Sequence, residues 1–229
     1  MTWPEVVEAT RRIASASLGI EIWAAEGSEP KAEDLDGLRS AAQDAPFAAV
    51  HARRALWFWD PDGLEREIAL AEAIGARTLV LHPGSLGLED VTSSADLPAI
   101  RRLVRQAEEA GVALALENTP GTLWALDRAP KGVGVCLDLG HLHLAEIPGS
   151  GVVSSAIGRF SDRLTHLHVH DNRGQDDDHL IPGGGSIDWQ GVLAALAQAR
   201  YAGPAVLELH AEGDPLLACE RARRFLALL

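Results

Sequence analysis

The sequence predicts an α/β protein of the TIM-barrel class, a (β/α)8-like barrel whose first strand is missing or truncated. Short apolar runs alternate with segments of helical spacing about every 30 residues, which is typical of βαβ units in a parallel sheet. A doubly wound sheet is the alternative, but no dinucleotide- or phosphate-binding glycine motif follows a strand. Metal-binding side chains stand where the strands end, which is where barrel enzymes place their chemistry.

The predicted strands are seven runs rich in Val, Leu, Ile and Ala, most of them bounded by Gly or Pro. This composition is typical of parallel strands, because both of their faces are covered. In chain order the runs are Leu18–Ala24, Phe47–Ala52, Thr78–Gly84, Val112–Asn118, Val133–Gly140, Leu164–Asp171 and Ala205–Ala211. A regular barrel has one strand more.

Helical spacing separates these runs. Gly63–Gly75 has apolar side chains three or four residues apart and ends at a glycine, as helices often do. Further helices are predicted at Pro4–Ser17, Leu97–Gly111, Gly191–Arg200 and Pro215–Leu229. The helix at Pro4–Ser17 precedes the first strand, whereas a regular barrel needs a strand ahead of it, so the first strand is the one predicted to be absent.

Composition limits the class of protein. With 229 residues, 47% hydrophobic and 23% charged, residues 1–229 are predicted to form a single domain. The net charge of -13 disfavours a nucleic-acid partner without excluding one. No secretory signal pattern or membrane-spanning apolar run occurs, and the only cysteines, Cys136 and Cys219, form no CxxC pair. We therefore expect a cytoplasmic protein with no membrane partner, and a homo-oligomer is compatible with these data.

Nearly every predicted strand ends in a side chain of the type that binds metals. These residues are His51, His82, Glu117, Asp138, His168 and Glu208. In most of these strands the candidate shares its face with small residues, while the larger aliphatic residues alternate onto the other face. A lone histidine is more often structural, but carboxylates are seldom buried in apolar strands without a partner. The pattern predicts a divalent metal site, with Zn or Mn favoured and Mg or Co as alternatives.

Two further groups of candidates lie just beyond strand ends. His141 follows Asp138 by three residues, and Asp177 and His179 form a D-x-H pair in the long polar loop Asp171–Ser186. A D-x-H pair can supply two ligands to one metal, so we predict a ligand role for Asp177 and His179. His166, His168 and His170 alternate along one strand, and of these His168 is the predicted ligand.

Several motifs together resemble the xylose isomerase-like TIM-barrel superfamily, also called AP endonuclease family 2. They are LVLHPGS (79–85), LALENTPG (114–121), VCLDLGH (135–141), HVHDNRGQDDDHLIPGGGSIDW (168–189) and VLELH (206–210). The resemblance extends from about Trp3 to the end of the chain. It implies the barrel fold and one of two activities.

The first activity is isomerisation or epimerisation of a small sugar or sugar phosphate. In that branch of the superfamily, one divalent metal is held by residues that match Glu117, Asp138, His168 and Glu208. The resemblance implies that Glu117 and Glu208 move a proton between adjacent substrate carbons through an enediolate-like intermediate. It also implies that His141 contacts substrate oxygens and that Arg173 binds the substrate or its phosphate.

The second activity is that of endonuclease IV, a multi-zinc phosphodiesterase that acts on abasic DNA. Its nine metal ligands also have matches here, namely His51, His82, Glu117, Asp138, His141, His168, Asp177, His179 and Glu208. Compact loops, the absence of a basic cluster and the acidic net charge favour the isomerase. A third reading, favoured by the missing strand, is a degenerate barrel without catalytic activity.

Further residues are candidates for binding the substrate. Asn118 and Asn172 are the only asparagines and both directly follow strand ends, so we expect specific hydrogen-bonding roles for them. His170 and Asp171 are expected either to orient the site or to bind substrate. Trp57, in the sequence LWFW, is either part of the core or of a subunit contact, or a stacking surface for a sugar ring or a base.

Overall fold

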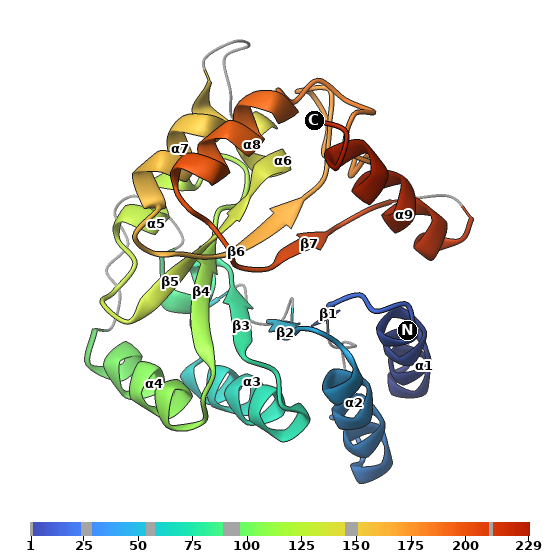
Figure 1. Ribbon diagram of the computed structural model, residues 1–229. Coiled ribbons are helices and arrows are strands. Elements are labelled where there is room, and N and C mark those ends of the chain that lie inside the picture. The colour runs from blue at the N-terminus through green and yellow to red at the C-terminus, as the bar shows by residue number, and fades with distance from the viewer. Residues whose placement is uncertain (1, 24–28, 54–57, 89–96, 145–150, 211–212) are drawn as a thin grey trace. The chain divides into compact units, whose positions relative to one another are not determined.

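The computed structural model describes residues 2–23, 29–53, 58–88, 97–144, 151–210 and 213–229 (Figure 1). The chain divides into two compact units. The first contains Met1–Leu116 and Ala125–Gly134, and the second contains Glu117–Trp124 and Val135–Leu229. That residues 1–229 form a single domain stays a prediction.

Seven strands lie in the described part of the chain, all parallel to their ladder partners, and their order follows the sequence without a crossover. They are β1 (Ile20–Trp23), β2 (Ala48–His51), β3 (Thr78–Leu81), β4 (Ala113–Glu117), β5 (Val133–Asp138), β6 (Leu164–Val169) and β7 (Ala205–Leu207). A helix precedes β1, and helices alternate with the strands. This is the order of a TIM barrel that lacks one strand, as the sequence predicts.

The helices around these strands are longer at the two ends of the chain than in the middle (Figure 1). They are α1 (Trp3–Ser15), α2 (Ala32–Asp44), α3 (Pro61–Ile74), α4 (Leu97–Glu109), α5 (Leu123–Asp127), α6 (Leu139–Leu144), α7 (Val152–Phe160), α8 (Trp189–Gln198) and α9 (Pro215–Leu226). A 3-10 turn, η2 (Pro83–Leu86), follows β3. Within the residues described, no helix is both long and apolar enough to cross a membrane.

Local sequence signals set the ends of several helices. Asp60 accepts a hydrogen bond from the Gly63 N–H at the start of α3, and Asp188 does the same for Gly191 in α8. Helix α3 ends at Gly75, whose φ of 79° lies in the left-handed region that glycine adopts without strain. These signals explain why α3 and α8 are found close to their predicted positions.

The register in the second unit brings strand ends level with one another. Asp138, the last residue of β5, pairs with His168 of β6, and His168 pairs with Val206 of β7. Because the strands are parallel, the residues at and beyond these positions meet at one edge. Glu208, two residues after Val206, lies at this edge as well.

The structure confirms all seven predicted strands, and several of them end earlier than predicted. The strand predicted over Thr78–Gly84 ends at Leu81, because Pro83 begins a 3-10 turn. Val133–Gly140 was also too long, because the carboxylate of Asp138 accepts the His141 N–H and starts helix α6. Helices α2, α5, α6 and α7 were not predicted, since their apolar residues are few or their lengths are short.

Candidate metal centre

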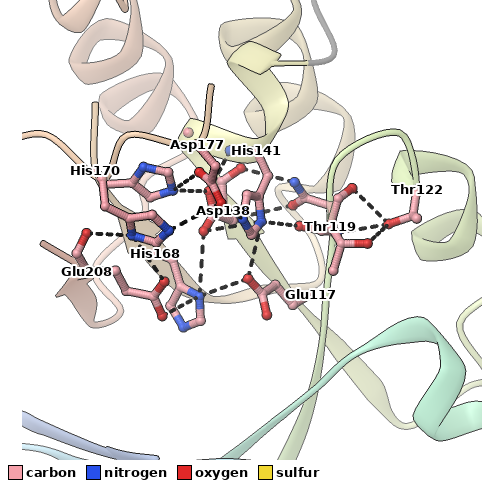
Figure 2. A network of polar contacts seen from close by, with 12 residues as sticks. Glu117, Thr119, Thr122, Asp138, His141, His168, His170, Asp177 and Glu208 are labelled. Carbon is pink, nitrogen blue, oxygen red and sulfur yellow. Dashed lines mark hydrogen bonds and ion pairs between the residues drawn. The ribbon is translucent and has the colours of Figure 1, made fainter. Parts of the chain in front are cut away.

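Four side chains of the second unit converge at the ends of β4, β5, β6 and β7 (Figure 2). The Nδ1 atom of His168 lies 3.1 Å from Glu117 Oε1 and 3.2 Å from Glu208 Oε1. The same nitrogen lies 3.9 Å from Oδ2 of Asp138. One imidazole nitrogen therefore faces three carboxylates that come from three other strand ends. We call Glu117, Asp138, His168 and Glu208 the strand-end tetrad.

Burial makes this arrangement costly without a compensating cation. Asp138 and His168 are 0% exposed and Glu117 is 1% exposed, whereas the Glu208 side chain is 22% exposed. The Oδ2 atom of Asp138 is buried and accepts no hydrogen bond from any described residue. Buried carboxylates need a positive partner. Three carboxylates and an imidazole are ligands that suit Zn or Mn, so the tetrad fits a divalent metal.

A second group of donors lies beside the tetrad. His141, His170, Asp177 and His179 each offer a ligand atom, and these atoms all lie within 4.8 Å of one another. Asp177 Oδ2 lies 3.3 Å from both His141 Nε2 and His179 Nε2. We call these four residues the loop cluster, since Asp177 and His179 come from the long loop after β6. The D-x-H pair thus reaches the site, although its ligand role stays a prediction.

The charges of the two groups raise the pKa values of His141 and His170. Burial alone lowers the pKa of His141, but the hydrogen bond with Asp177 and the charges of Asp138 and Glu117 outweigh it and raise the pKa to about 9. The same hydrogen bond lowers the pKa of Asp177 to about 2. Burial also lowers the pKa of His170, but the hydrogen bond to Asp138 together with the charges of Asp138 and Asp177 outweighs it, so the pKa is raised. The protein without metal therefore carries protons on histidines that a metal would have to displace.

Asn118 links two of the strand ends. Its Nδ2 donates to the Asp138 carbonyl and its Oδ1 accepts from the Asp138 N–H, each at 3.0 Å. Its own carbonyl lies 3.0 Å from His141 Nδ1. The specific hydrogen-bonding role expected from the scarcity of asparagine is therefore present. Substrate binding by Asn118 stays a prediction.

The long loop after β6 is organised by a carboxylate. Asp171 is fully buried, and its Oδ1 accepts the N–H groups of Asn172 and Ile187, while its Oδ2 accepts those of Gly183 and the Trp189 indole. The four bonds are 2.8–3.2 Å long. The prediction that Asp171 orients the site fits this arrangement. The sequence did not predict that Trp189 donates to Asp171, because the two residues lie at opposite ends of the loop.

The remaining predicted site residues are His51, His82, Arg173 and Trp57. His51 and His82 belong to the first unit, where their ring centroids are 4.9 Å apart, and their ligand role stays a prediction. The Arg173 side chain is 65% exposed and lies 3.6 Å from Asp178. Trp57 lies outside the described residues.

Two glycines of the site leave no room for a side chain. A Cβ on Gly140 would lie 2.0 Å from the His170 ring, and one on Gly185 would lie 2.2 Å from the Asn172 carbonyl. Both positions exclude any side chain because another group fills the space. The only signal for them was their place inside the DLGH and GGGS motifs.

The family assignment follows from the comparison with known proteins. The sequence model of the family described as xylose isomerase-like TIM barrel matches residues 11–229. The chain therefore belongs to the xylose isomerase-like TIM-barrel family, as its motifs predict.

Three individual comparisons illustrate the range of this family. The uncharacterised protein y4fM of Sinorhizobium fredii is 31% identical over 224 residues, which cover 86% of this chain and 69% of that protein. A probable endonuclease 4 of Mesoplasma florum is 28% identical over 181 residues, covering 66% and 59%. A crystal structure of D-psicose 3-epimerase in the presence of D-fructose has a TM-score of 0.74 and 18% identity, covering 99% and 93%. That structural likeness confirms the fold.

Proposed function

We propose that this protein is a divalent-metal-dependent epimerase or isomerase of a small sugar or sugar phosphate. The observation that carries the proposal is the strand-end tetrad, in which Nδ1 of His168 faces the carboxylates of Glu117, Asp138 and Glu208. Its donor set and the buried Oδ2 of Asp138 fit one divalent cation.

The four tetrad residues would hold the metal. When bound, a divalent cation polarises substrate oxygens and offsets the negative charge that develops next to a carbonyl. Glu208 is the least buried of the four, with its side chain 22% exposed, so a substrate would approach the tetrad from its side. Manganese and zinc both accept this mixture of carboxylate and imidazole ligands.

The proton transfer is assigned to the two glutamates. Glu117 stands at the end of β4 and Glu208 follows β7, so the two carboxylates approach the tetrad from different strands. One carboxylate would remove the proton from the carbon next to the substrate carbonyl, and the other would return a proton to the same or the adjacent carbon. His141, whose Nδ1 lies 3.4 Å from Asp138 Oδ2 and 3.5 Å from Glu117 Oε1, would contact a substrate oxygen.

Two observations support a sugar over DNA as the substrate. The solved D-psicose 3-epimerase shares the fold over nearly the whole chain. The net charge of -13 opposes a polyanionic partner. We also propose that the protein is cytoplasmic and forms a homo-oligomer. The composition is compatible with both.

The second candidate is a multi-zinc phosphodiesterase of the endonuclease IV type. The loop cluster favours it, because Asp177, His141 and His179 could hold another metal next to the tetrad. Two or more metals can clamp the attacking and leaving oxygens of a phosphate ester. The probable endonuclease 4 of Mesoplasma florum adds weight to this candidate. A degenerate barrel without activity is the third.

Metal content and proton exchange separate these candidates. Protein purified without chelator should contain one divalent metal per chain and should incorporate deuterium from D2O into D-fructose, D-psicose or a related ketose, detected by mass spectrometry. The variants Glu117→Gln and Glu208→Gln should stop the exchange, while the surface control Glu220→Gln should not. Two or three zinc ions per chain with cleavage of abasic DNA would establish the second candidate instead. A metal-free protein inactive on both would establish the third.

A further inference from the structure

Asp138 uses one carboxylate oxygen for hydrogen bonds and leaves the other free of them. Oδ1 lies 2.7 Å from the His141 N–H nitrogen and 3.0 Å from Nε2 of His170. A carboxylate oxygen only accepts, so Nε2 of His170 must carry the proton. Two donors occupy Oδ1, whereas Oδ2 accepts no hydrogen bond from the described residues and lies 3.4 Å from His141 Nδ1 and 3.9 Å from His168 Nδ1. The carboxylate is therefore held in one orientation.

The His170 ring is fixed by its surroundings. It is 0% exposed, and its face stacks on the His179 ring with centroids 3.9 Å apart and planes 7° apart. Its edge lies against the backbone of Gly140, where a Cβ would come within 2.0 Å of Cε1. The Gly140 carbonyl in turn accepts a hydrogen bond of 2.9 Å from Asn172 Nδ2. The ring occupies space that exists only because residue 140 has no side chain.

We propose that His170 is a positioning residue that makes Asp138 a one-oxygen metal ligand, and that Gly140 is a glycine in order to admit the His170 ring. Groups that hold a metal-binding side chain from behind commonly change metal affinity by 10- to 100-fold when removed. His170 would thereby act behind the ligand, which is the first of the two roles that the sequence leaves open for it. This inference rests on the metal centre of the proposed function.

The test is the affinity of the chelator-treated protein for Zn2+ and Mn2+, measured by competition with a chromophoric chelator. His170→Phe keeps the ring and loses the N–H, and should weaken binding by about 10- to 100-fold. His170→Gln restores a donor and should recover part of the affinity. The matched control is His143→Phe, since His143 lies on the same short helix as Gly140 and bonds Ser186 instead. The control should bind like the wild type.

Gly140→Ala provides an independent test. Alanine ordinarily stabilises a helix relative to glycine, but here its Cβ would displace the His170 ring. Gly140→Ala should therefore weaken metal binding as His170→Phe does, and the double variant should be no weaker than either, because both changes break one contact.

Two results would overturn the inference. One is metal affinity within twofold of the wild type in folded His170→Phe, whatever its thermal stability. The other is full additivity of Gly140→Ala and His170→Phe. If His170→Phe fails to fold, the affinities of Gly140→Ala and His170→Gln decide in its place. A wild-type protein that binds neither metal would overturn the proposed function itself, and this inference with it.

Discussion

Replacing Asp171 by asparagine should destabilise the protein severely, although the change is nearly isosteric. The carboxylate accepts four hydrogen bonds inside the protein, two on each oxygen. Asparagine keeps one carbonyl oxygen and turns an NH2 group toward the other two donors. Those donors would be buried without an acceptor, at about 1–3 kcal/mol each. We therefore expect a loss of about 2–6 kcal/mol in the free energy of unfolding, a large part of the stability of an ordinary domain.

The assay is urea unfolding of the chelator-treated protein, followed by circular dichroism. Asp188→Asn is the matched control, because it makes the same chemical change next to Trp189 at a helix N-cap, where asparagine and aspartate are equivalent. The control should stay within about 0.5 kcal/mol of the wild type. Hydrogen exchange should locate the effect, since the amides of Gly183 and Ile187 donate to Asp171 and should exchange faster in the variant. A loss below about 1 kcal/mol with both amides still protected would refute the reasoning.

Three further predictions concern the site. First, two pKa shifts make the stability of the metal-free protein depend on pH. The raised pKa of His141 contributes stability that is fully present below pH 6.5 and is lost as the pH rises toward 9. The lowered pKa of Asp177 contributes stability that is present above pH 3.8 and is lost as the pH falls toward 2. The stability advantage of wild type over Asp177→Asn should therefore be largest between pH 4 and 6.5 and vanish above pH 9, with Asp176→Asn flat throughout; a pH-independent difference would contradict the pairing. Second, Zn2+ or Mn2+ at 100 times its Kd should stabilise the wild type by about 2.7 kcal/mol in the same urea assay, and an unchanged midpoint would count against the metal centre. Third, Glu208→Gln should lower turnover at least 100-fold with an unchanged circular dichroism spectrum, and retained turnover would remove Glu208 from the proton transfer.

Sequence periodicity predicted the elements that are decided locally. Strands such as β3 could be found because they are buried on both faces, which requires a continuous apolar run such as Thr78–Leu81. Helix α3 could be found because its cap, Asp60, and its stop, Gly75, are encoded in the chain itself. Helix α6 could not, since its start depends on the Asp138 carboxylate closing onto the His141 N–H at a strand end.

The candidate ligands were also determined by the sequence. A carboxylate or histidine at the end of a parallel strand must point to a common edge, so Glu117, Asp138 and His168 could be named before any distance was known. What the tertiary structure decided is how each candidate ligand is held. The bonds from His170 to Asp138 and from Trp189 to Asp171 span 32 and 18 residues of chain. Such contacts leave no periodic trace, because they depend on where the backbone brings two distant side chains together. Gly140 is the clearest case, since only the ring of His170 beside it explains why that position is a glycine.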